Sequence, residues 1–172
     1  MSTIRLGRVT RADAADLIAA NRASQDYHLP WVASFTDQAG FDNWFSRCLT
    51  GPNVGLVARE AASNEVVGII NVNEIVAGVF QSAYLGYYGM SGFARKGLMT
   101  EALRAAVSYA FGDLGLHRLE ANIQPGNRAS IALVQRLGFQ KEGYSPRYLR
   151  IDGEWRDHER WALLADRPGE AR

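Results

Sequence analysis

The sequence has only one cysteine, Cys48, among 172 residues. One cysteine cannot form an intramolecular disulfide, so a small disulfide-stabilised fold is excluded, and a free thiol suits a reducing compartment. Long apolar runs are also missing. No stretch is long enough to cross a bilayer, and the first ten residues lack the apolar core of a signal peptide. We therefore expect a cytoplasmic protein with no membrane partner.

The chain has almost no net charge. Nineteen basic and eighteen acidic residues leave a formal net charge of +1. Proteins that bind nucleic acids usually carry a basic excess, so we expect no direct nucleic-acid partner. The three histidines, His28, His117 and His158, are scattered, and no cluster of cysteines or carboxylates accompanies them. The sequence therefore predicts no metal site.

Repeats, low-complexity tracts and linkers are absent as well. A chain of 172 residues with 47% hydrophobic residues is long enough for one domain with a full core. We place this domain at residues 1–165 and a C-terminal tail at residues 166–172. The oligomeric state is left open between a monomer and a homodimer.

Signals for strands and helices alternate along the chain. Thr10 is placed to cap a first helix that runs to about Gln25, with Asp13 at the capping-box distance, and Thr36 to cap a second helix. Two further helices are expected at residues 98–114 and 127–138. Strand patterns lie at residues 4–9, 54–59, 66–73, 82–90, 118–123, from 139 onward with 148–151, and 154–164. The prediction is an α/β (α+β) fold, with a mixed, mostly antiparallel sheet of about seven strands flanked by about four helices.

The segment from His117 to Gly143 is the most informative. A short strand ends in Gln124-Pro125-Gly126, and Asn127 is a favourable N-cap for the helix that follows. Gly138 has the position of a C′ glycine at the end of this helix. The helix therefore begins with an Asn-x-x-Ser turn, formed by Asn127 and Ser130, which presents free N–H groups and short polar side chains to a ligand.

A second glycine-containing turn, Gly92 to Thr100, joins a strand to the longest helix. Free N–H groups at the start of a helix, together with the helix dipole, can bind a diphosphate. Arg95 and Lys96 add positive charge, and Gly97 permits close approach of the backbone. Taken alone, the same residues also fit a solvated turn with two surface bases.

Together these segments resemble the GNAT N-acetyltransferase superfamily and, within it, the ribosomal-protein-alanine N-acetyltransferase (RimJ/RimL) family. The resemblance is dense from about Asn71 to Leu163. It is carried by His117-Arg118, Asn127, Ser130, Leu137-Gly138-Phe139, Glu142-Gly143, Ile151 to Asp157, Tyr84 to Tyr87, Lys96 to Met99 and Glu101 to Leu103. The resemblance implies a GNAT-like fold and acetyl-CoA as cosubstrate.

By resemblance, the turn before the long helix is the pyrophosphate loop, with Arg95, Lys96, Gly97, Leu98, Met99 and Thr100 at the cofactor. Two positions depart from the family pattern: Ala94 stands at its first position and Met99 at its last, where the larger side chain is expected to push the loop outwards. The backbone of Tyr88, Gly89 and Met90 is expected to lie nearest the acetyl group and to supply an N–H to the oxyanion. Gly86 either allows close backbone approach or makes room for packing.

The resemblance also implies that Asn127 hydrogen-bonds the pantetheine arm. The usual tyrosine acid is replaced by Val134, so Ser130 is expected to act at the leaving thiolate. For the general base, Glu74 is the candidate, Glu120 and Glu142 are alternatives, and a mechanism without a protein base stays open.

The expected acceptor cleft lies between residues 27–35, residues 74–80 and the hairpin at Asp152-Gly153. Trp31 and Tyr148 are expected to form an aromatic wall in it. The resemblance implies acetyl transfer to an amine, first of all the N-terminal α-amine of a ribosomal protein. A small amine or amino-acid derivative is an alternative acceptor, and a CoA-binding regulatory or ribosome-assembly module without turnover is an alternative of another class.

Overall fold

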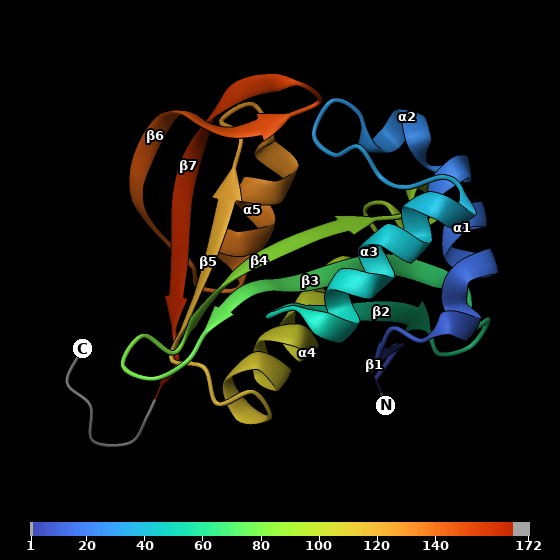
Figure 1. The fold of residues 1–172 in the computed structure, drawn as a ribbon, viewed down its shortest axis with the longest axis horizontal. Coiled ribbons are helices and arrows are strands. Elements are labelled where there is room, and N and C mark those ends of the chain that lie inside the picture. Colours follow the sequence, from blue (N-terminus) through green and yellow to red (C-terminus); the bar gives the residue numbers. More distant parts are fainter. Residues whose placement is uncertain (1, 167–172) are drawn as a thin grey trace.

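A mixed seven-stranded sheet, in the order β1-β2-β3-β4-β5-β7-β6, organises the molecule (Figure 1). The computed structural model describes residues 2–166, so residues 167–172 of the expected tail lie outside the described residues. The strands are β1 (Ile4–Arg8), β2 (Val54–Glu60), β3 (Val66–Val76), β4 (Ser82–Gly89), β5 (Arg118–Ile123), β6 (Gln140–Ile151) and β7 (Glu154–Leu164). All neighbouring strands are antiparallel except β4 and β5, which confirms the predicted fold class.

The described residues form five α-helices, one more than expected. They are α1 (Ala14–Ala23), α2 (Gln25–His28), α3 (Gln38–Thr50), α4 (Leu98–Gly112) and α5 (Arg128–Arg136), with short 3₁₀ turns at Arg11–Asp13 and Ser91–Phe93. The extra helix arises because the predicted first helix is interrupted at Ser24, whose φ of −110° and ψ of 10° are not helical. None of the helices between residues 2 and 166 is long and apolar enough to span a membrane.

The helix caps agree with the sequence in two cases and differ in one. Asp13 accepts hydrogen bonds from the backbone N–H and the hydroxyl of Thr10 (2.7 and 2.9 Å), and Asn127 accepts one from the N–H of Ser130 (3.2 Å). The cap of α3 is Asp37 and not Thr36, because the Asp37 carboxylate accepts from the N–H of Gly40 at 2.7 Å. Thr36 therefore lies just before the cap.

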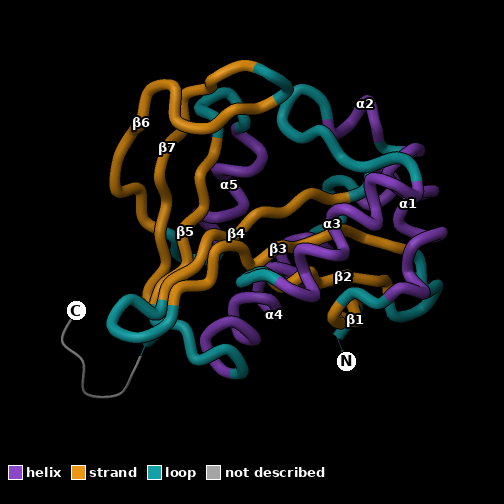
Figure 2. Tube along the Cα trace, in the orientation of Figure 1, coloured by secondary structure: helices purple, strands orange, loops and turns teal. Residues whose placement is uncertain are grey.

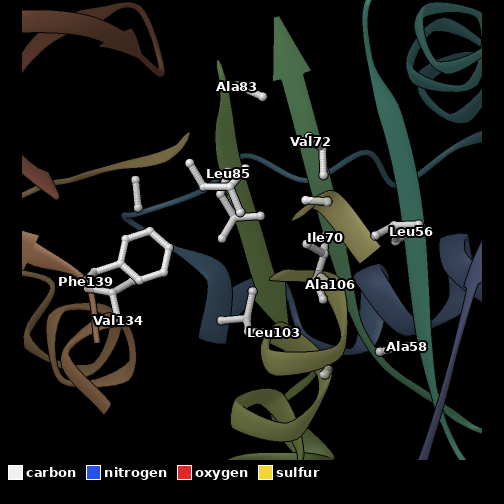
Figure 3. Close-up of a cluster of buried hydrophobic side chains, with 14 of the residues drawn as sticks. Leu56, Ala58, Ile70, Val72, Ala83, Leu85, Leu103, Ala106, Val134 and Phe139 are labelled. Carbon is white, nitrogen blue, oxygen red and sulfur yellow. The ribbon is translucent and has the colours of Figure 1, made fainter. Parts of the chain in front are cut away.

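Alternation along the strands separates two clusters of buried side chains, one on each face of the sheet. Leu56 and Ile70 belong to the larger cluster, which packs against α4 and α5. Figure 3 shows Leu103 and Ala106 of α4 beside the strands in this cluster, with Val134 of α5 and Phe139 to one side. The smaller cluster packs against α1 and α3 and consists of Leu17, Phe41, Phe45, Val57, Val66, Ile69 and Met90.

Strands β4 and β5 pair over only three residues. The paired residues are Ser82 with Arg118, Ala83 with Leu119 and Tyr84 with Glu120. Beyond these pairs the strands diverge, as Figure 2 shows, while β4 stays paired with β3 on its other side as far as Gly89. The sheet is therefore open along one seam in its middle.

Candidate active site

A cavity of about 1190 Å³ lies where β4 and β5 diverge. Its walls come from both diverging strands, from the turn that precedes α4, and from α4 and α5. The lining residues include Leu85 to Met90, Phe93 to Glu101, Ala121 to Gln124, Asn127 and Ser130, with Trp31 and His158 at the side of the N-terminal helices and β7. The two polar turns singled out in the sequence therefore meet in one cavity.

The hydrogen bonds between β3 and β4 determine which backbone groups of β4 face this cavity. The N–H of Met90 donates to the carbonyl of Val67 at 2.8 Å. Since the direction of backbone groups alternates along an antiparallel ladder, Leu85, Tyr87 and Gly89 direct theirs away from β3 and into the gap. Of the three residues expected to offer a backbone N–H, only Gly89 does so; the N–H groups of Tyr88 and Met90 are turned toward β3.

His28 holds the end of β4 in place. Its Nε2 donates to the carbonyl of Gly89 at 2.9 Å, and its Nδ1 lies 2.9 Å from the hydroxyl of Ser34. Its ring meets that of Tyr88 edge-on, with centroids 4.8 Å apart. Burial lowers the pKa of His28 more than the bond to Gly89 raises it, so the neutral ring is favoured.

Two glycines of β4 have different roles. A Cβ added at Gly89 would lie 2.8 Å from Cγ of Met99, and one added at Gly68 of β3 would meet the sulfur of the same side chain. Met99 therefore packs inward, into a notch left by these two glycines, and the expected outward displacement of the loop is wrong. A Cβ at Gly86 would have only ordinary contacts, the nearest at 3.6 Å, so protein packing does not require a glycine there.

The turn before α4 has the backbone shape of an anion-binding loop. Arg95 and Gly97 both have positive φ, 62° and 78°. The N–H groups of Thr100 and Glu101 bond to the carbonyl of Gly97, so the first N–H groups of the helix itself stay available for a ligand. The arginine and lysine residues that line the cavity are Arg95, Lys96, Arg104 and Arg136. Sequence reasoning missed the last two, which lie outside the loop motif and join it only in three dimensions.

Ser130 and Tyr87 form a pair of hydroxyl groups inside the cavity. Their oxygens are 2.6 Å apart although the residues are 43 positions apart in the chain. Burial raises the pKa of Tyr87 to about 12, against the opposing effect of the bond to Ser130. Tyr87 therefore keeps its proton at any ordinary pH. Sequence reasoning missed this hydroxyl, because nothing local marks it.

Asn127 caps α5 and Val134 lies on it, as the sequence suggested. Asn127 lines the cavity and caps the helix through the N–H of Ser130. Val134 is fully buried in the larger core cluster, so no side chain from this position reaches the cavity. The hydroxyl of Ser130, one turn earlier on the helix, is therefore the α5 side chain that could take the place of the missing tyrosine.

The structure does not bring the three candidate carboxylates into the cavity. Glu74 is exposed, has a φ of 51° and binds Asn53 through its backbone N–H. It is not among the lining residues and does not meet Ser130. Arg118 holds both of the others: its Nε donates to Glu120 at 2.8 Å, and its terminal nitrogens bind Glu142, whose pKa the guanidinium lowers.

The acceptor side of the cavity differs from the expected one. Residues 74–80, which form the end of β3 and part of the turn before β4 (Figure 1), line no part of the cavity. Trp31 lines the cavity. Tyr148 is not among the lining residues, and its ring packs against that of His158, with centroids 6.2 Å apart. A second hollow of about 320 Å³ adjoins at Trp31, between the loop after α2 and the β6–β7 hairpin, and is lined by Trp31, Gln124, Pro125, Gly126, Tyr144, Trp155, Arg156 and Asp157. Among residues 2–166, no three His, Cys, Asp or Glu side chains gather in a way that could hold a metal ion.

Comparison with known proteins gives a consistent result. The acetyltransferase (GNAT) domain model matches residues 3–140. The [ribosomal protein uS5]-alanine N-acetyltransferase of Escherichia coli (strain K12) is 48% identical over 99 residues, which cover 58% of this chain and 51% of that protein. The match thus spans about half of that relative's length. The L-methionine sulfoximine/L-methionine sulfone acetyltransferase of Pseudomonas paraeruginosa is 33% identical over 130 residues, 74% of each chain.

A solved structure, Mycobacterium smegmatis RimJ in complex with CoA-disulfide, superimposes with a TM-score of 0.85 at 27% identity. The alignment covers 98% of this chain and 85% of that one.

The loop before α4 can be tested through Gly97, at which an added Cβ would meet no atom within 4 Å. Gly97→Glu places a negative charge where a diphosphate has to lie, so calorimetry should show at least ~10-fold weaker binding of CoA, or ~1.4 kcal/mol. Gly97→Gln is the matched control, since it carries the same backbone strain at positive φ without the charge. Equal affinities for the two variants would exclude a diphosphate at this loop.

Gly86 tests the open face of β4. Gly86→Ala should leave the unfolding temperature within a few degrees of the wild type, because the new methyl has no close contact with the protein. It should lower kcat/KM at least ~10-fold, because the methyl occupies the space through which a substrate approaches the strand. Gly7→Ala on β1, also free of close neighbours, is the control. A Gly86→Ala variant as active as Gly7→Ala would contradict the assignment of this face of β4 to substrate binding.

Proposed function

The chain belongs to the GNAT acetyltransferase family, and we propose that it transfers the acetyl group of acetyl-CoA to an amine, first of all the N-terminal α-amine of a ribosomal protein. The observation that carries this proposal is the open seam between β4 and β5. It leaves backbone groups of Tyr87 and Gly89 unpaired by β5 beside a cavity that runs to the start of α4.

The residues present fit the parts of acetyl-CoA. The N-terminus of α4 with Arg95 and Lys96 suits the diphosphate, and Arg104 and Arg136 add positive charge to the cavity wall. The outward backbone groups of β4 and the side chain of Asn127 suit the amides of the pantetheine arm. The thioester then lies deeper in the seam, between β4 and Ser130.

In the reaction the neutral amine attacks the thioester carbonyl in a ternary complex. The outward N–H groups of Tyr87 and Gly89 are the donors available to the oxyanion of the tetrahedral intermediate. When the C–S bond breaks, the hydroxyl of Ser130 donates a hydrogen bond to the leaving thiolate, and the hydroxyl of Tyr87 supports it from 2.6 Å away. The protein thus contributes mainly position and hydrogen bonds.

Two observations favour an α-amine on a protein. The uS5-alanine N-acetyltransferase is 48% identical in the shared region, and the aromatic hollow beside Trp31 offers room for residues that follow an N-terminus. The chemistry also fits. An α-amine has a pKa near 7.7–8.0, so roughly a tenth is neutral at pH 7, whereas a lysine amine near 10.4 is almost fully protonated.

An amino-acid derivative is the second candidate acceptor. The relative that favours it is the methionine sulfoximine and sulfone acetyltransferase, which aligns over 74% of this chain. Such an acceptor would fill the cavity next to β4 and leave the hollow beside Trp31 unused. If so, a substitution in that hollow, such as Trp155→Ala, should leave KM for the amino-acid derivative unchanged. It should change KM only for peptide acceptors.

The hydroxyl pair can be tested with Ser130→Ala, Tyr87→Phe and the double variant. Each single change should lower kcat on the order of 10-fold with little change in CoA affinity, because the hydroxyls act at the developing thiolate. The double variant should be no slower than the worse single one, since the two groups work as one donor. Additive losses, or a normal kcat for Ser130→Ala, would refute the pair.

The acceptor class is tested with peptides that carry one lysine and either a free or a blocked N-terminus. CoA release, followed with a thiol reagent, should be fast only with the free N-terminus. Equal rates with both peptides would show that lysine is the acceptor. Efficient turnover of amino-acid sulfones or polyamines alone would favour the small-amine alternative, and CoA binding without turnover of any amine would favour the non-catalytic module.

A further inference from the structure

Few side chains that line the cavity can accept a proton from a bound amine. The candidates with a basic atom are His28, Glu101 and His158. His28 has both ring nitrogens engaged, with Ser34 and with the carbonyl of Gly89. The carboxylate of Glu101 is held by Ser2 and Thr3 at the start of α4, at the diphosphate end of the cavity. His158 is therefore the one that remains among the described lining residues.

One hydrogen bond of His158 fixes its tautomer. The side chain is 3% exposed, and its Nδ1 lies 2.9 Å from the carbonyl oxygen of Arg156. A carbonyl can only accept, so Nδ1 carries the hydrogen and Nε2 carries the lone pair. Nε2 has no hydrogen-bond partner among residues 2–166, and it is not one of the fully enclosed unpaired atoms. It therefore keeps access to the cavity.

The register of the sheet places His158 on the side from which an amine would approach. Asn122 pairs with Arg160, so their side chains share one face of the sheet, and His158 lies two residues from Arg160 on that face. Gly86, which leaves β4 open, lies on the same face, since it alternates with Tyr87. Tyr87 and Ser130 belong to the opposite face, against α5.

We propose that His158 is the general base of the acetyl transfer, a role that rests on the proposed acetyltransferase function. The amine nitrogen bonds to the thioester carbon, and Nε2 of His158 takes the proton that the nitrogen loses. The C–S bond then breaks and the carbonyl re-forms; the thiolate leaves with a hydrogen bond from the hydroxyl of Ser130 and takes a proton from solvent. His158 returns its proton to solvent, so the products are the amide and the free thiol of CoA.

The groups around His158 are mixed in charge. Asp157 is close enough for the two side chains to interact electrostatically, while Arg156 and Arg160 flank it on β7. Tyr148 of β6 packs against the ring; the nearest ionisable groups of β5 and β4 on this face are Glu120 and Tyr84. The unpaired atoms Asn122 Oδ1 and Arg160 Nε are an acceptor and a donor on directly opposed residues, so they complement each other and we assign neither to the substrate.

The test is the pH dependence of kcat/KM for the wild type and His158→Gln, with two acceptor peptides whose amine pKa values differ. In the plot of kcat/KM against pH, a limb due to ionisation of the amine shifts along the pH axis when the peptide is changed. A limb due to ionisation of a protein group stays at the same pH. His158→Gln should lose the limb that does not move and lower kcat about 100-fold, within the usual range for a general base. Its affinity for CoA should be unchanged, which also shows that the variant is folded.

Two comparisons complete the test. Glu74→Gln should keep the limb that does not move; if it loses that limb while His158→Gln retains it, the base is Glu74 and the proposal is overturned. On the wild-type protein, nitrogen NMR should show that the neutral ring of His158 carries its hydrogen on Nδ1 and none on Nε2. A neutral ring with its hydrogen on Nε2 would overturn the assignment even if His158→Gln failed to fold. A wild-type protein that binds CoA but acetylates no amine would refute the proposed function itself, and this role with it.

Discussion

The rest of the site depends on the separation of β4 from β5 after three paired residues. A buried backbone N–H or carbonyl without a partner costs free energy, so an open seam in the middle of a sheet persists only where another group or solvent satisfies it. Here the seam opens into a cavity, and the outward groups of Leu85, Tyr87 and Gly89 line it. Under the proposed function, the backbone groups that stay unpaired here would bind an extended ligand that carries amides.

The seam is held open from both sides. On the side of β3, β4 is paired without interruption from Asn73 and Tyr84 to the pair of Gly68 and Gly89. Met99 of α4 fills the notch left by those two glycines, which links the first turn of the helix to the end of the strand. On the other side, His28 binds the carbonyl of Gly89. The strand end, the helix start and α2 are thus joined by direct contacts, and fixed placement of groups is what a reaction based on position requires.

The open seam also gives the site two chemically different sides. The larger core cluster, with α5, presents two neutral hydroxyls, Ser130 and Tyr87, and burial keeps the latter protonated. The other face presents His158, whose hydrogen bond to a backbone carbonyl leaves Nε2 as a proton acceptor. Under the proposed function, a thioester held in the seam would have a hydrogen-bond donor on the side of its sulfur and a proton acceptor on the side of the incoming amine. Because Ser130 and His158 lie on opposite faces of one sheet, they do not hydrogen-bond to each other.

The sequence by itself determined the local structure. Strong short-range signals, such as Asn127 before α5, Gly138 after it and Asp152-Gly153 between β6 and β7, placed these elements, because capping and turn geometry depend on neighbouring residues. The same kind of signal placed the loop at Gly97. Only the tertiary structure decided which backbone groups of β4 face the cavity, since that follows from its register with β3. It also decided the Ser130–Tyr87 pair, the inward packing of Met99, the exclusion of Glu74 and the position of His158, because each arises from contacts between elements distant in the chain, and no local pattern encodes the geometry in which those elements meet.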